Sequence, residues 1–202
     1  MTRKTISTKH QFTNRELTLS VARSLIENLD DNVAFYLQKT AAELGIFSKK
    51  LWPEPKQIEQ AISDHMELFA STTDSVLNNK QPIYKNLLSI FCDYSPIIYL
   101  FRILDLVPLI NKIYLQLTAP TIEDIARKLI NLNIPYEISV SKRRIKNGTT
   151  EINTLKFFAG ETEINLFIFS GSTIKPFIID PLTGQSVQHK KLTYFATTPD
   201  IV

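Results

Sequence analysis

The stretch Ile97–Ala119, IIYLFRILDLVPLINKIYLQLTA, is strongly apolar and decides how the rest of the chain is interpreted. Its length would allow it to span a membrane as a helix. Against this, Pro108 interrupts it, and a charge near the bilayer centre costs about 2.5–3.5 kcal/mol. Its charged residues are Arg102, Asp105 and Lys112. The stretch therefore predicts two buried strands, Ile97–Leu104 and Lys112–Thr118, and no membrane span.

The sequence before this stretch has the periodicity of helices. Residues 1–13 are basic and hydroxyl-rich without an apolar run, which predicts a disordered, solvated arm and no secretory signal. Caps and apolar spacing then predict four helices: one starting at Asn14 as its N-cap, one over Val33–Leu44 ended by Gly45, one over Ile58–Phe69 and one over Tyr84–Phe91.

The sequence after the stretch changes to the period of strands. Thr121 as N-cap, followed by two acidic residues, predicts a helix over Thr121–Leu132. Asn147-Gly148 is a hairpin signal between two strand-like segments, and a further strand follows it. The predicted strands are Tyr136–Ile145, Glu151–Phe158 and Glu163–Phe169.

The order of elements, helices first and then βαβββ, predicts an α+β fold. We expect a disordered arm at 1–13, a helical segment at 14–95 and an α+β domain with a mixed sheet at 96–202. The 202 residues, 44% hydrophobic and 21% charged, fit an ordinary globular protein. A net charge of +3 is too mild to indicate a particular partner. The lone Cys92 cannot form an intramolecular disulfide, which fits a cytoplasmic location.

Several familiar chemistries are missing from the sequence. The glycines have neither the G-x-G-x-x-G nor the P-loop spacing that cradles phosphates. The histidines are scattered, and with a single cysteine they form no zinc pattern. These residues are His10, His65 and His189.

Two carboxylates at a strand start are a candidate metal site. Glu161 and Glu163 are two residues apart, so on a strand their side chains would share one face. Such a pair could hold a divalent cation or perform acid–base chemistry. A solvated strand start after the Gly160 turn is the alternative interpretation.

A cluster of basic residues lies on one arm of the predicted hairpin. Alternation places Lys142, Arg144 and Lys146 on one face, and Arg143 on the other face with Ile145. A basic ribbon of this kind could contact nucleic-acid phosphates. A charged hairpin tip that keeps an edge soluble is the alternative interpretation.

Several segments, taken in order and with their spacing, resemble a bacterial protein family with a nucleotidyltransferase-like domain behind helices. The resemblance runs from about Leu17 to Leu192. The matching segments are QKTAAELGI at Gln38–Ile46, IEQAISDHMELF at Ile58–Phe69, the strand–helix unit at Ile113–Ile138, AGETEINLFIF at Ala159–Phe169 and IIDPLTGQSVQHKKL at Ile178–Leu192.

This resemblance implies a sheet whose second strand carries an acidic residue for Mg²⁺, preceded by a Gly-Thr or Gly-Ser turn that holds phosphates. In this chain, Asp105-Leu106 occupies the position implied for the turn, and Lys112 occupies the position implied for the acid. A later carboxylate falls at Asn165, with Glu163 two residues earlier. The glycine, the hydroxyl and the expected acids are therefore replaced.

Phosphoryl-type chemistry depends on metal ions that neutralise developing charge. We therefore expect a non-catalytic relative, a binding or scaffold module without a cofactor. One alternative is an active Mg²⁺-dependent nucleotidyltransferase with a rearranged site built from Glu161, Glu163 and Asp105. The other is nucleic-acid binding through Lys142, Arg144 and Lys146.

Overall fold

The computed structural model describes residues 3–28, 31–69, 80–145, 148–170 and 178–197. The protein has an α+β fold in which an N-terminal helical segment precedes a mixed sheet, as the sequence predicted. The chain forms two compact units. The helical unit contains α1 (Arg3–Glu27), α2 (Val33–Glu43), α3 (Pro55–Phe69) and α5 (Arg102–Leu106); the sheet unit contains α4 (Gln81–Phe91), α6 (Ile122–Asn131), α7 (Leu192–Thr197) and the strands.

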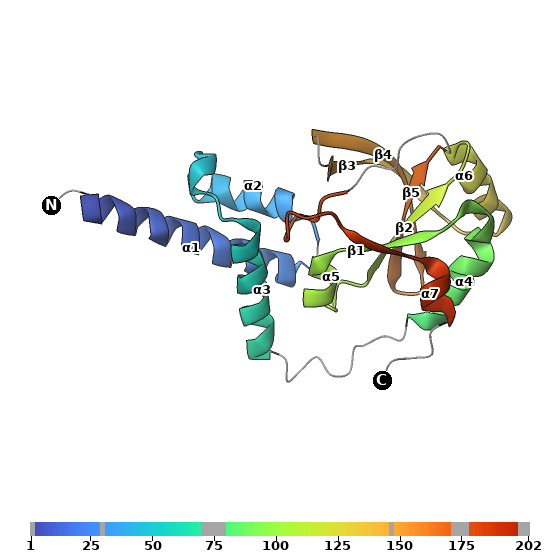
Figure 1. Cartoon of the computed structure of the whole chain (residues 1–202), viewed down its shortest axis with the longest axis horizontal. Coiled ribbons are helices and arrows are strands. Elements are labelled where there is room, and N and C mark those ends of the chain that lie inside the picture. The colour runs from blue at the N-terminus through green and yellow to red at the C-terminus, as the bar shows by residue number, and fades with distance from the viewer. Residues whose placement is uncertain (1–2, 29–30, 70–79, 146–147, 171–177, 198–202) are drawn as a thin grey trace. The chain divides into compact units, whose positions relative to one another are not determined.

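In the helical unit, α1 packs against both α2 and α3 (Figure 1). The α2 helix begins and ends where local signals predicted. The Asn32 side chain accepts a hydrogen bond from the Phe35 N–H at 3.2 Å, and Gly45 follows the helix with a φ of +69°. Glycine is favoured there because other residues pay a steric penalty in the left-handed region. The helix predicted over Ile58–Phe69 corresponds to α3.

The predicted start of the first helix at Asn14 is wrong. The α1 helix begins at Arg3, so it includes most of the segment that was predicted to be a disordered arm. The segment from Arg3 to Asn14 contains no proline or glycine, so no residue in it breaks a helix. Asn14 instead donates from its side-chain Nδ2 to the Leu51 carbonyl at 3.2 Å, which ties α1 to the short helix η1 (Lys49–Leu51).

The described residues form a sheet of six strands in the order β3-β4-β5-β2-β1-β6. Only β2 and β5 pair in parallel, and the other neighbours among the described strands are antiparallel. The strands are β1 (Ile97–Leu100), β2 (Lys112–Thr118), β3 (Glu137–Ile145), β4 (Gly148–Ala159), β5 (Thr162–Phe169) and β6 (Gln188–Lys191).

One face of the sheet carries the main core. Alternate strand residues such as Leu115 and Leu166 pack there against apolar residues of α4, α6 and α7. These three helices gather on one side of the sheet (Figure 1). Because Leu87 and Phe91 belong to this core, α4 belongs to the sheet unit. The boundary therefore lies before α4, whereas the sequence placed it after residue 95.

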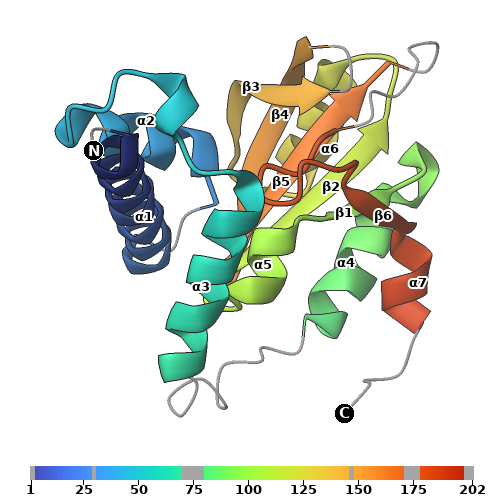
Figure 2. The same cartoon turned by 60° about the vertical axis from the view of Figure 1, so that its left-hand side comes forward.

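Two elements differ from the predicted strands. The strand expected over Ile97–Leu104 ends at Leu100, and α5 follows it. The buried Ile103 of α5 lies four residues before the buried Val107, which directly follows the helix, and this is helical spacing. The β6 strand was missed because its sequence, QHKK, has no apolar alternation. It forms through backbone pairing with β1, beside which it lies in Figure 2.

The elements that carry strong local signals agree with the prediction. The β2 strand has the predicted bounds. The α6 helix begins with a capping box, in which the Asp124 N–H donates to Thr121 Oγ1 at 3.3 Å and the Thr121 N–H donates to the Asp124 carboxylate at 3.2 Å. Within the described ranges, the helices are too short or too polar to cross a membrane.

Candidate functional site

The expected position of the later metal-binding carboxylate is occupied by a network of paired side chains around Glu163. The Asn165 side chain donates from Nδ2 to Glu163 Oε1 at 2.9 Å. The Lys156 ammonium lies 3.7 Å from Glu163 Oε2 and 3.5 Å from Glu137 Oε2. We call Glu137, Lys156, Glu163 and Asn165 the Glu163 cluster. Asn165 is buried and Glu163 keeps 19% of its side chain exposed, so these contacts are partly shielded from water.

Lys112 lies next to this cluster. It begins β2 and is the register partner of Glu163 on the parallel neighbour β5. Partner residues on adjacent strands are about 4.8 Å apart and direct their side chains to the same face. A lysine therefore adjoins Glu163 at the position where the resemblance implies a metal-binding acid.

The other two residues of the alternative acidic site, Glu161 and Asp105, do not have the surroundings that this site requires. Glu161 is in the turn before β5 and is exposed, so the prediction that it shares a strand face with Glu163 is wrong. Asp105 lies in α5, with its carboxylate 3.9 Å from Arg102 Nη1. Asp105-Leu106 is thus helical and not a phosphate-binding turn. In the described part of the chain, no group of three or more His, Cys, Asp or Glu side chains could hold a metal ion.

The basic hairpin has the predicted division into two faces. Lys142 and Arg144 are exposed, whereas Arg143 between them is half-buried. The Lys142 ammonium lies 3.4 Å from Glu151 Oε1 on β4, so part of the positive charge of this face is neutralised. Lys146 and Asn147 lie outside the described residues.

Arg143 is surrounded by aromatic rings. Its guanidinium carbon lies 5.3 Å from the ring centre of Phe101, 5.1 Å from that of Tyr114 and 5.2 Å from that of Phe167. These distances are within the range of cation–π attraction. The buried Nε has no hydrogen-bond partner among the described atoms. We call these four residues the Arg143 cluster; alternation placed Arg143 on the opposite face from Lys142 and Arg144, but nothing in the sequence identified the rings.

Tyr99, on β1, extends this aromatic face. Its ring centre lies 5.9 Å from that of Phe167, and its hydroxyl donates to Gln116 Oε1 at 2.6 Å. Burial raises the pKa of Tyr99 to about 12. Gln116 is buried, and its Nε2 has no partner in the described region. The sheet face that carries Tyr99, Tyr114 and Phe167 is therefore tightly packed, and few of its polar atoms are accessible to a substrate.

The raised pKa of Tyr99 predicts a loss of stability at alkaline pH. The neutral phenol is favoured in the folded state, so the stabilisation is fully present below the ordinary pKa of 10.0. It is lost as the pH rises through the folded pKa of about 12. We expect the urea midpoint to fall over this range and to fall less steeply in Tyr99→Phe.

Tyr99→Phe also removes the hydrogen bond to Gln116, which lowers stability at every pH. The test therefore compares the slope of the urea midpoint against pH, and not the midpoint at one pH. Burial raises the pKa of Tyr84 as well. The slope of the urea midpoint against pH is therefore also measured for Tyr84→Phe, and we expect it to be less steep than in the wild type. An unchanged slope in Tyr99→Phe would contradict the prediction.

Comparison with known proteins does not assign this chain to a family. No protein-family model matches the chain, and no curated protein matches it. Functional arguments therefore rest on the residues themselves.

Proposed function

We propose that this protein is a non-catalytic relative of nucleotidyltransferase-like proteins that acts as a binding or scaffold module. The single observation that carries the proposal is the environment of Glu163. Its two carboxylate oxygens face Asn165 and Lys156, and Lys112 is its register partner on the adjacent strand.

This environment is unfavourable for Mg²⁺. The ion is usually bound through carboxylates and substrate phosphates, in near-ideal octahedral geometry. Here the carboxylate of Glu163 is already compensated by an ammonium group. Two unit charges about 4 Å apart interact by about 4 kcal/mol at an effective dielectric constant of 20. A dication entering beside Lys156 would meet repulsion of at least that order.

The contacts also bear on the two alternatives. A rearranged metal site would need Glu161 and Asp105, but Glu161 lies off the strand and Asp105 lies close to Arg102. Nucleic-acid binding through the hairpin would use Lys142, which is paired with Glu151. Neither alternative is favoured by these contacts.

A transfer assay tests the proposal. The purified protein and Glu163→Gln are incubated with labelled nucleoside triphosphates, Mg²⁺ or Mn²⁺, and RNA, protein or small-molecule acceptors. We expect no labelled product from either protein and no metal-dependent rise in the melting temperature with nucleotide, because a ligand bound to the native state alone would raise stability.

Transfer by the wild-type protein that Glu163→Gln abolishes would overturn the proposal and assign Glu163 to the active site. Transfer unaffected by Glu163→Gln would also overturn it and would place the activity elsewhere in the chain. An established nucleotidyltransferase run in parallel shows that the assay detects transfer.

A further inference from the structure

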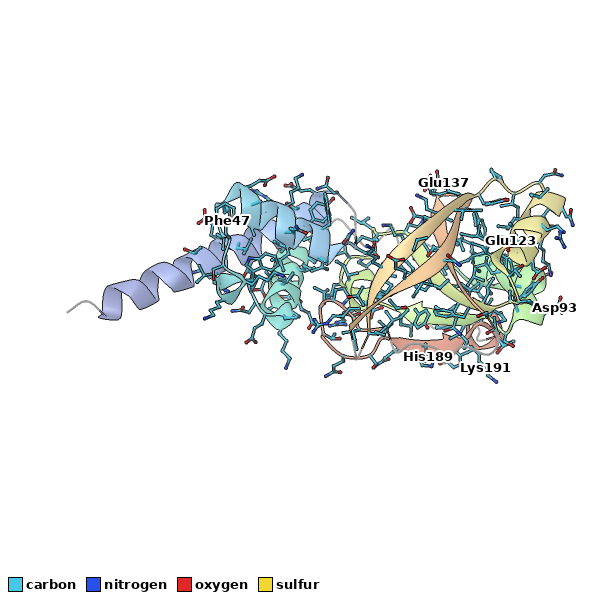
Figure 3. All side chains as sticks on the ribbon, turned by 90° about the horizontal axis from the view of Figure 1, so that it is seen from above. Phe47, Asp93, Glu123, Glu137, His189 and Lys191 are labelled. Carbon is cyan, nitrogen blue, oxygen red and sulfur yellow. The ribbon has the colours of Figure 1, made fainter. Side chains whose placement is uncertain are left out.

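The helical unit contains an open groove of about 990 Å³ that is lined by α1, η1 and α3. All three elements belong to this unit, which carries the labelled Phe47 in Figure 3. Sites for small molecules usually have volumes of about 300–1,000 Å³. The groove is therefore large enough for an organic ligand.

The lining of the groove carries more positive than negative charge. Arg15 of α1, Lys50 of η1 and Lys56 of α3 line it, and Asp64 is the one acidic side chain among its described lining residues. In the part of the chain that the structure describes, the three cations form no ion pair. Asp64 accepts a hydrogen bond from Gln60 Nε2 at 2.7 Å. The formal charge of the lining is therefore +2.

Acidic residues near the start of α3 do not cancel this charge. Glu54 and Glu59 precede and follow the first turn of the helix, and neither is among the residues that line the groove. Glu59 Oε1 instead accepts a hydrogen bond from Arg102 Nε at 2.8 Å. Lys56 lies in the first turn, which contains no acidic residue. The helix dipole adds to the attraction of an anion at this end of α3.

The groove also has an apolar part. Leu19 is 52% exposed, and Leu51 and Ala61 line the groove as well. Covering exposed apolar surface is favourable, so an apolar group on the ligand would strengthen its binding. The Asn14 side chain donates to the Leu51 carbonyl at 3.2 Å and holds η1 against α1. This part of the groove is therefore formed before a ligand enters.

We propose that this groove binds a small organic phosphate monoester. Such a group carries a charge of about −1.5 to −2 at pH 7, which is complementary to the lining. The guanidinium of Arg15 suits a bidentate contact with two phosphate oxygens, and Lys50 and Lys56 supply point charges. The organic group covers Leu19. These cations neutralise the phosphate directly, so binding requires no divalent metal.

Binding at the groove does not depend on whether the Glu163 cluster is catalytic, because the two sites share no residue. It also differs from nucleotide transfer in its ligand requirements. A metal chelator should leave the groove occupied, whereas phosphoryl-type chemistry depends on metal ions.

Titration calorimetry of the full chain with phenyl phosphate, in the presence of EDTA, tests the proposal. Inorganic phosphate and phenol are titrated separately, because each offers one part of phenyl phosphate. We expect phenyl phosphate to bind with a dissociation constant of about 1 mM or lower, and about fivefold more tightly than either part. Raising the salt from about 20 mM to about 200 mM should weaken the binding, because salt screens exposed charges.

Three variants locate the binding. Arg15→Gln combined with Lys56→Gln should weaken binding of phenyl phosphate about tenfold, because the phosphate loses two of its charged contacts. Lys39→Gln is the matched control, since Lys39 is an exposed cation of the same unit that does not line the groove, and affinity should stay within about twofold. Asp64→Asn should tighten binding about twofold, because it removes the negative charge of the lining. A damaged fold would not produce this gain.

Circular dichroism establishes that the variants are folded. The absence of phenyl phosphate binding in EDTA would overturn the inference, as would equal affinities for phenyl phosphate and inorganic phosphate. Binding that the double variant does not weaken would also overturn it and would place the phosphate elsewhere on the protein. Weaker binding by Asp64→Asn would contradict the charge complementarity on which the inference rests.

Discussion

Replacing Phe167 by alanine should lower the free energy of unfolding by about 3–5 kcal/mol. Phe167 is fully buried on the central strand β5. Its ring centre lies 5.5 Å from that of Tyr114 and 5.2 Å from the guanidinium carbon of Arg143. The substitution therefore removes apolar burial, leaves a cavity and takes away one of the rings around a half-buried cation. Urea unfolding of the two proteins measures the difference.

Phe158 on the neighbouring strand β4 is the matched control. It is 58% exposed, so Phe158→Ala should cost less than about 1 kcal/mol. Typical domains are stable by about 5–15 kcal/mol, so the loss expected for Phe167→Ala is a large share of the total. Equal losses in the two variants would contradict the described burial of Phe167.

Replacing Arg143 by alanine should lower the free energy of unfolding by about 2 kcal/mol. Three rings lie within cation–π distance of its guanidinium, and the aliphatic stem adds packing on the sheet face. The individual ring contributions do not add, because the three rings share one cation. Arg144→Ala, at the exposed neighbouring position, should change stability by less than about 0.5 kcal/mol.

Arg143→Met separates the charge of Arg143 from its packing. Methionine fills much of the same space and eliminates the buried Nε, which has no partner among the described atoms. We expect its stability to lie between those of the wild type and Arg143→Ala. If Arg143→Met equals the wild type in the urea experiment, the cation contributes nothing and the cation–π account is wrong.

Local signals predicted α2, α6 and β2 well. The caps of α2 and α6 depend on residues within a few positions of each other, such as Asn32 with Phe35 and Thr121 with Asp124. Segments that lack such signals were predicted poorly. The polar strand β6 exists because β1 pairs with it, and its own sequence carries no strand pattern.

The candidate site was likewise predicted only in part from the sequence. The resemblance drew attention to Lys112 and Asn165, at positions where it implies acids, and to Glu163 two residues before Asn165, but it did not point to Lys156. The pairing of Lys156 with Glu163 follows from the register of β4 against β5, in which Lys156 is opposite Asn165. Register depends on the whole sheet, so no local pattern could supply it.

The sequence by itself determined the α+β class, the helices α2 and α6, the buried β2 strand and the placement of Arg143 on the opposite face of β3 from Lys142 and Arg144. Each of these depends on the periodicity or capping of nearby residues. Only the tertiary structure decided that Ile97–Ala119 contributes two strands and a helix, because α5 packs on α3 within the helical unit. It also decided which residues surround Arg143 and Glu163, since those contacts join strands that are distant in the chain.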